Sequence, residues 1–311
     1  MNTKSINKNI ASKINEWIDS IEDESIRKGL RDPEKGVLVS GGCIASLLLG
    51  VGVNDYDIYI KSVDVLRSVV QYYTKGRPIE VLDFAHSNEY KQYLEDRSVW
   101  MCKYPDSEED YAEYSIAIRN LKPDQIKLYM SHHPGGLKIE YPEDTDLKPY
   151  RPVFFSPNAI SLSDDVQIVV RFWGDAEQIH KSFDFIHATN YWDFKTGLTC
   201  NTDALLSLMT KTLKYHGSLY PVTSIMRMKK FVKRGFNIGA GEIMKIIMQI
   251  NELDLTNPDV LEEQLTGVDV AYFSTLINAL RDIEDKSKIT SGYVNEIIER
   301  VFSEHVDQTE E

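Results

Sequence analysis

The chain has 311 residues, of which 42% are hydrophobic and 10% aromatic, enough apolar surface for a sizeable core and two domains. Its formal net charge is −13, whereas proteins that coat duplex nucleic acid are usually basic, because their affinity comes largely from phosphate contacts. The three cysteines lack the spacing of a disulfide framework or a structural zinc site. We therefore expect a globular, cytoplasmic protein that is not a general nucleic-acid coat.

The N-terminal segment has the periodicity of an amphipathic helix. Its apolar residues recur at helical spacing, so we expect one helix or two short ones within residues 1–30, packed on the domain surface. The segment lacks the apolar core of a signal peptide, and the apolar run 43–53 is too short to span a bilayer. We expect no membrane association.

Short strands and helices then alternate. We expect strands over residues 37–39, 55–60 and 78–85, and helices over 43–49 and 63–75. The pair Gly41-Gly42 ends the first strand, and Ser62 is the expected N-cap of the second helix.

Residues 86–150 are acidic, rich in Tyr and Pro, and only weakly periodic, so they are predicted to be an insertion, with one strand over 114–120. Further strands are expected over 152–156, 159–163, 166–173 and 183–188, with a short helix over 177–182. The pattern is helical from residue 201 onward, with helices expected over 201–217, 223–236, 241–253, 257–265, 270–283 and 292–305. The layout predicts an α+β head over 1–200, with the insertion 86–150, and a helical domain over 201–311.

Asp55 and Asp57 place two carboxylates on one side of a strand, about 6.6 Å apart. Like charges this close repel each other unless something positive lies between them. Mg²⁺ and similar hard cations take oxygen ligands and leave positions open for substrate phosphates, and two such metals can clamp the oxygens of a nucleotidyl transfer. The alternative is a solvated pair on an edge strand.

Gly41 and Gly42 precede a helix whose free N–H groups point toward its start. Helix N-termini bind phosphates, and glycine lets a phosphate approach the backbone closely. Ser40 adds a hydroxyl, so a triphosphate held here would bring its phosphates to metals on Asp55 and Asp57. A simple turn is the alternative for the glycine pair.

The order of these features carries a family resemblance. The sequence resembles the nucleotidyltransferase superfamily, the polymerase-beta-like fold of poly(A) polymerases and CCA-adding enzymes. The resemblance lies in a hydrophobic strand followed by Ser40-Gly41-Gly42, a helix, and then a strand that contains Asp55-Tyr56-Asp57. The resemblance covers roughly residues 35–85 and 160–235. It implies a mixed sheet in the head, an all-helical C-terminal domain, Mg²⁺ or Mn²⁺ as cofactor, and transfer of an NMP from an NTP to a hydroxyl acceptor. ATP is the expected donor and an RNA 3′ end the expected acceptor.

The family carries a third carboxylate on a neighbouring strand. By resemblance we assign it to Asp184, flanked by Phe183 and Phe185, as a metal ligand or as the general base toward the incoming hydroxyl. Asp83, which also lies within an apolar predicted strand, is the rival.

The residues from Lys211 to Gly241 include seven basic residues and no acidic one, which reverses the overall charge. The resemblance implies that four residues contact the nucleotide, namely Lys211, Lys214, Tyr215 and Arg227. It implies that four others contact the acceptor, namely Lys229, Lys230, Lys233 and Arg234. A solvated basic face is the alternative, and the absence of a clear base-selecting motif leaves the choice of nucleotide open.

Three other functions stay open. The acceptor can be a protein or a small molecule, since this fold serves many acceptors. The chain can also be an inactive nucleotide-binding or interaction module, against which the intact aspartate pair argues. A nuclease or phosphohydrolase is the third, and the glycine-helix element and the lack of a histidine near the aspartates in the sequence argue against it.

Overall fold

The computed structural model of the chain describes residues 3–83, 126–130, 133, 136–142, 147–255 and 257–264, together with 292 and 296. The chain divides into two compact units, residues 1–216 and 217–311. The described part of the first unit combines helices with a large mixed sheet, and that of the second is mainly helical. The predicted α+β class is confirmed.

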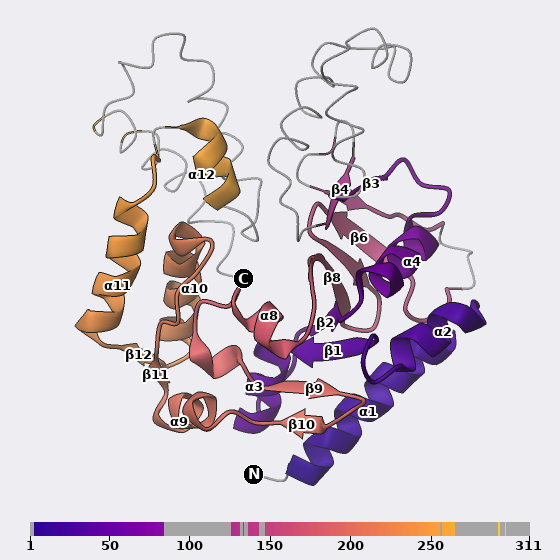
Figure 1. Ribbon diagram of the computed structural model, residues 1–311, viewed down its shortest axis with the longest axis horizontal. Coiled ribbons are helices and arrows are strands. Elements are labelled where there is room, and N and C mark those ends of the chain that lie inside the picture. Colours follow the sequence, from indigo (N-terminus) through magenta and orange to yellow (C-terminus); the bar gives the residue numbers. More distant parts are fainter. Residues whose placement is uncertain are drawn as a thin grey trace, which may run out of the picture. The chain divides into compact units, whose positions relative to one another are not determined.

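An eight-stranded sheet forms the centre of the first unit (Figure 1), in the order β10-β9-β1-β2-β8-β7-β6-β5. Its strands are β1 (Val37–Ser40), β2 (Tyr56–Ile60), β5 (Leu137–Lys138), β6 (Pro152–Ser156), β7 (Ala159–Leu162), β8 (Val166–Trp173), β9 (Tyr191–Asp193) and β10 (Gly197–Thr199). β2 and β8 run parallel, whereas the other neighbours in this sheet are antiparallel. A second sheet pairs β3 (Glu80–Asp83) with β4 (Ile126–Tyr129).

The helices of the first unit follow the predicted apolar periodicity. Among the residues that the structure describes, they are α1 (Thr3–Ser20), α2 (Glu24–Arg31), α3 (Gly42–Leu49), α4 (Val63–Thr74), α8 (Ala176–His180) and α9 (Thr202–Thr210), with a 3₁₀ turn, η1 (Ile186–Ala188). The apolar stripe of α1 is buried, and its Trp17 donates a hydrogen bond to the hydroxyl of Tyr73 on α4 over 2.9 Å. Asp23 separates α1 from α2, because its carboxylate caps the first N–H groups of α2.

The face of β2 that carries Asp57 packs against other elements further along the strand, at Tyr59. Tyr59 forms a small core with Leu38 of β1 and Ile179 of α8, and Phe183 and Tyr191 pack against it. Since alternate residues of a strand share a face, Asp57 lies on the same face of β2 as Tyr59. The segment from α8 to β9 therefore borders the carboxylate face of the sheet.

One predicted element is wrong, and a second is shorter than predicted. Residues 183–188 form no strand, because Asp184 lies in a bend and η1 follows, so that only Phe185 forms an isolated bridge, with Tyr215. The helix predicted over 201–217 ends at Thr210, because Lys211 adopts a left-handed conformation (φ 47°) and its N–H caps carbonyls of α9. β11 (Thr212–Leu213) follows at once, since a β-branched Thr favours an extended backbone.

The second unit contains α10 (Pro221–Lys233), β12 (Asn237–Ile238), α11 (Ala240–Asn251) and α12 (Pro258–Gln264). α12 begins at Pro258, one residue after the start of the range predicted for this helix, and the backbone carbonyl of Asn257 accepts the N–H of Leu261. The predicted strand 114–120 and helix 270–283 lie outside the described residues, as does 292–305 apart from Gly292 and Glu296. Within the described helices, none is long and apolar enough to cross a membrane.

Candidate functional site

The glycine turn and the aspartate strand meet at the start of α3. Val39 of β1 pairs with Ile58 of β2, so the next residue of β1, Ser40, comes level with Asp57. Gly41 has a φ of +94°, and a Cβ atom placed on it would lie 3.2 Å from Oδ2 of Asp57. A glycine therefore suits this position in two ways, for its backbone conformation and for the close approach of the carboxylate.

The two aspartates differ in their surroundings. Asp55 is exposed just before β2, whereas Asp57 is half-buried within it. Burial raises the pKa of the Cys43 thiol on α3, and the negative charge of Asp57 raises it further, which places Asp57 beside the first turn of α3. In the parallel strand β8, Gln167 is level with Asp57. Asp57 thus lies between the first turn of α3 and the strand position of Gln167.

This donor set suits a hard divalent cation. Among the described residues, no three His, Cys, Asp or Glu side chains come together as a metal-binding group. Mg²⁺, however, is usually held by one or two carboxylates together with water and substrate phosphates, rather than by a cage of protein ligands. Asp55 and Asp57, one of them exposed, are the residues that would supply protein oxygens to a magnesium ion shared with a phosphate.

Ser40 takes part in the turn, but its hydroxyl points into the protein. The side chain is fully buried, with Oγ 2.9 Å from the carbonyl oxygen of Asn190 and 2.8 Å from Nε2 of His180. Gly42 is exposed at the first turn of α3, and the N–H of Gly41 donates to the carbonyl of Ala188 over 3.2 Å. Of the three predicted phosphate-contacting residues, Gly42 is the one exposed to an incoming ligand.

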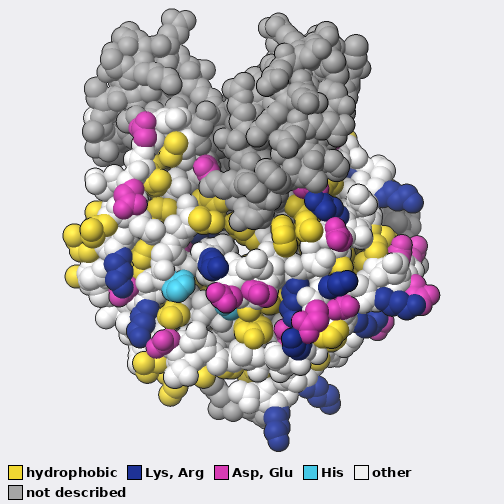
Figure 2. Space-filling model, in the orientation of Figure 1, with side chains coloured by type: hydrophobic (Ala, Val, Ile, Leu, Met, Phe, Trp, Pro, Cys, Tyr) yellow, Lys and Arg dark blue, Asp and Glu magenta, His cyan; other side chains and the backbone are white. Residues whose placement is uncertain are grey.

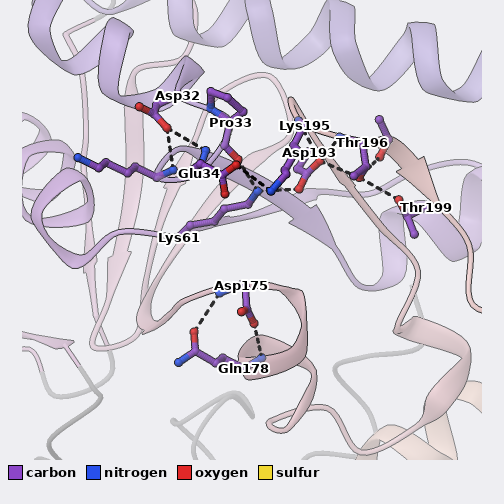
Figure 3. Close-up of polar contacts among 12 residues, drawn as sticks. Asp32, Pro33, Glu34, Lys61, Asp175, Gln178, Asp193, Lys195, Thr196 and Thr199 are labelled. Carbon is purple, nitrogen blue, oxygen red and sulfur yellow. Dashed lines mark hydrogen bonds and ion pairs between the residues drawn. The ribbon is translucent and has the colours of Figure 1, made fainter.

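His180 is a part of this site that the sequence did not reveal. It ends α8, and Asp175 and Gln178 fix that short helix by a reciprocal capping box (Figure 3). Burial and then the nearby His216 lower the pKa of His180 to about 4, so its imidazole is neutral at neutral pH. Its partner Ser40 is 140 residues away in the chain, too far for any local pattern to connect them.

The two candidates for a third carboxylate have different settings. Asp184 is buried in the bend between α8 and η1, where its backbone carbonyl accepts the backbone N–H of His216 over 2.7 Å. Asp83 lies on β3, in the separate two-stranded sheet, and accepts a hydrogen bond from Nε of Arg67 over 2.8 Å. The ion pair with Arg67 explains the buried charge of Asp83 without a catalytic role.

The predicted nucleotide-contacting residues belong to both units. Lys211 is exposed at the end of α9, and Lys214 lies 3.8 Å from the carboxylate of Asp203. Tyr215 is buried, with its ring 5.9 Å from that of Phe185 in an edge-to-face contact. Arg227 belongs to the second unit, on α10.

The four predicted acceptor-contacting residues also belong to the second unit. Lys229, Lys230 and Lys233 lie in the last turns of α10 and Arg234 directly follows, and all four are exposed. Cations in the last turn of a helix also interact favourably with its dipole. On the face drawn in Figure 2, Lys and Arg side chains alternate with Asp and Glu instead of forming one basic field.

Comparison with known proteins identifies a family. A model of the family described as "Gabija anti-defense 2 family protein" matches residues 8–211. A relative named "Gabija anti-defense 2", from Bacillus phage SPbetaL7, is 26% identical over 136 residues, which are 43% of this chain and 33% of the relative. The chain therefore covers about a third of that relative's length.

Solved structures of CCA-adding enzymes show a distant likeness. The Bacillus stearothermophilus enzyme in complex with CTP is 12% identical, with 86% of this chain and 52% of that chain covered and a TM-score of 0.37. The Thermotoga maritima enzyme complexed with tRNA is 15% identical, with 94% and 60% covered and a TM-score of 0.35. Likeness at this level carries no conclusion about the site. The family model, in contrast, matches more than half of the 311 residues, so this chain belongs to the Gabija anti-defense 2 family.

Proposed function

We propose that this chain is a metal-dependent nucleotidyltransferase, which moves an NMP from an NTP, with ATP as the expected donor, to a hydroxyl acceptor. The observation that carries the proposal is the close approach of the glycine turn to Asp57. Gly41 opens α3 directly against Asp57, and Asp55 lies exposed beside it. A triphosphate on the turn would lie within reach of both carboxylates.

Each group has a separate part in such a transfer. Asp55 and Asp57 would hold Mg²⁺ or Mn²⁺, which, when bound, neutralises charge on the phosphates. The free N–H groups at the start of α3 orient the phosphates, helped by the positive end of the helix dipole. Asp184 is proposed to take the proton of the attacking hydroxyl, and Lys211 and Lys214 are proposed to attract the triphosphate.

For the acceptor we propose an RNA 3′ end, which the exposed cations of α10 would hold by its phosphates. The family's description favours a second candidate, in which a component of Gabija is the target, either as the acceptor of the NMP or as the partner of an inactive binding module. The buried Ser40 hydroxyl and the buried Tyr215 also favour the inactive module, since both groups are withdrawn from a ligand.

The test is an incubation with each NTP labelled at the α-phosphate, because that label moves with the NMP. Purified protein receives Mg²⁺ or Mn²⁺, with no acceptor, with short RNA, or with extract from cells that carry Gabija. The proposal expects label on RNA with ATP. Label on a protein in the extract would support the second acceptor, and binding of NTP without transfer to anything would leave only the inactive module.

A further inference from the structure

The hydroxyl of Ser40 has a definite hydrogen-bond arrangement. A hydroxyl has one hydrogen to donate, and a carbonyl oxygen can only accept. Oγ of Ser40 lies 2.9 Å from the carbonyl oxygen of Asn190 and 3.4 Å from that of Ala188, so its hydrogen is directed to these carbonyls. The remaining contact, 2.8 Å to His180, then requires that Nε2 of His180 carries a hydrogen and donates it to Ser40.

The position and charge of His180 agree with this direction. The ring of His180 lies near those of Phe183 and Tyr191, with centroid distances of 5.1 and 6.0 Å, and the capping box of α8 fixes the backbone that carries it. With a pKa lowered to about 4 by burial and by His216, the ring is neutral at neutral pH and has a single N–H. Nε2 is the nitrogen that the geometry selects for it.

The glycine turn is therefore held from one segment of the chain. His180 donates to Ser40, the carbonyl of Asn190 accepts from Ser40, and the carbonyl of Ala188 accepts the N–H of Gly41. The same turn touches the carboxylate of Asp57. A change at His180 would loosen the turn at the point where the backbone meets the aspartate strand, without removing any group proposed to touch the nucleotide.

We infer that His180 is a positioning residue, which acts through the Ser40 hydroxyl to hold the Gly41-Gly42 turn in the conformation that binds the phosphates of an NTP. This inference rests on the proposed function for the identity of the ligand. His180 itself touches neither the nucleotide nor the acceptor. Its loss should weaken binding of the donor more than it slows the transfer step.

The experiment compares wild type, His180→Ala, His180→Gln and the control His216→Ala, which removes the exposed neighbouring ring. ATP binding is measured by calorimetric titration with Mg²⁺, the KM and kcat of transfer by kinetics, and the fold by Tm. His180→Ala should weaken ATP binding and raise KM about tenfold, the size expected for one well-placed hydrogen bond, with kcat within about threefold of wild type. His180→Gln should recover most of the affinity, because its amide N–H can donate to Ser40, and His216→Ala should bind like wild type.

Wild-type affinity in His180→Ala, or a His180→Gln variant as weak as His180→Ala, would overturn the inference. If His180→Ala is unfolded at the assay temperature, Ser40→Ala removes the same hydrogen bond from its other side and must show the same weakening. The two claims fail separately. If wild type binds ATP without transfer, the proposed reaction is rejected, and the binding comparison still decides the role of His180. If wild type does not bind ATP, the proposed reaction and the role of His180 are both rejected.

Discussion

Single residues at this site are constrained by their neighbours more than by their own chemistry. Gly41 has a positive φ, and a Cβ on it would lie only 3.2 Å from the carboxylate of Asp57. Ser40 and His180 are hydrogen-bonded to each other within the protein. Asp83 and Asp184 are both buried, but their surroundings suggest different uses. Arg67 pairs with Asp83, whereas Asp184 lies within the segment that holds the glycine turn.

Substitution separates the two candidates for the general base. Asp184→Asn should lower turnover at least about 10²-fold, the lower end for loss of a general base, while ATP binding is kept. Asp83→Asn should keep turnover but lower the free energy of unfolding by about 1–3 kcal/mol, because it removes the charged partner of Arg67. Steady-state kinetics and chemical denaturation of both variants decide this, and the opposite pattern would move the base to Asp83.

At the scale of elements, one polar network ties the hairpin β9–β10 to the rest of the sheet (Figure 3). Asp193, at the end of β9, accepts Nζ of Lys61 over 2.6 Å and both the N–H and the hydroxyl of Thr196. Lys61 follows β2 and also donates to the carbonyl of Pro33 over 2.8 Å. β2, the hairpin and the α2–β1 connection thus meet at one buried ion pair.

This ion pair predicts a pH dependence of stability. Burial by itself raises the pKa of Asp193, but the hydrogen bonds from Lys61 and Thr196 outweigh burial, so the pKa is lowered. A lowered pKa in the folded state stabilises the protein above the unfolded value of about 3.9, and that contribution is lost as the pH falls through the folded value. Asp193→Asn should therefore lower Tm at pH 7 and reduce the loss of Tm between neutral pH and the acid range.

Tm measured from pH 7 downward tests this, with Glu34→Gln as the control. Glu34 is an exposed acid that pairs with Lys195 at 2.7 Å, and an exposed pair contributes little to stability. Equal acid dependence in wild type and Asp193→Asn would show that the ion pair does not stabilise the fold.

Periodicity predicted most of the elements, because a buried face requires apolar residues at the regular spacing of a helix or a strand. The alternation in β2 and the apolar stripe of α1 are examples. Periodicity failed where contacts between residues far apart in the sequence determine the backbone conformation. Residues 183–188 alternate like a strand but form a single isolated β-bridge, between Phe185 and Tyr215. The left-handed cap of α9 is Lys211, a residue type that does not predict this conformation as glycine does. The hairpin β9–β10 was also missed, although Gly197, with a φ of 66°, marks its turn.

The site could be predicted only as far as its residues are close in sequence. Gly41 and Asp57 lie on adjacent elements, and the structure brings them into contact. His180 and the carbonyls of Ala188 and Asn190 reach the turn through the order of β9, β1 and β2 in the sheet, which no spacing along the chain encodes.

At the scale of the whole molecule, charge is the property that bears on the partner. The net charge of −13 opposes binding of a polyanion, so any RNA contact depends on local cations such as those of α10. If these cations bind RNA, their affinity would be independent of sequence, because each phosphate they neutralise releases a counterion.

The double variant Lys229→Ala/Lys230→Ala should therefore bind short RNA more weakly, to a similar degree for different sequences. The logarithm of its RNA-binding constant should fall less steeply with the logarithm of salt concentration. The slope should be flatter by about 0.7 for each phosphate of a single strand that the variant no longer neutralises. Lys4→Ala/Lys8→Ala, which removes two exposed lysines from α1, should leave the slope unchanged. Titrations at several salt concentrations test this. Identical slopes for all three proteins would show that Lys229 and Lys230 do not contact RNA and only face the solvent.

The central claim is that Asp55 and Asp57 serve a metal-dependent transfer, and the rate of NMP transfer from α-labelled ATP tests it most directly. The comparison is between wild type, Asp55→Asn, Asp57→Asn and the control Asp19→Asn, an exposed acid on α1 that pairs with Arg31. Wild type and Asp19→Asn should transfer label when Mg²⁺ is present. Either site variant should lose transfer while its Tm is kept, because the change relieves a repulsion between like charges. Transfer at the wild-type rate by Asp57→Asn would contradict the account.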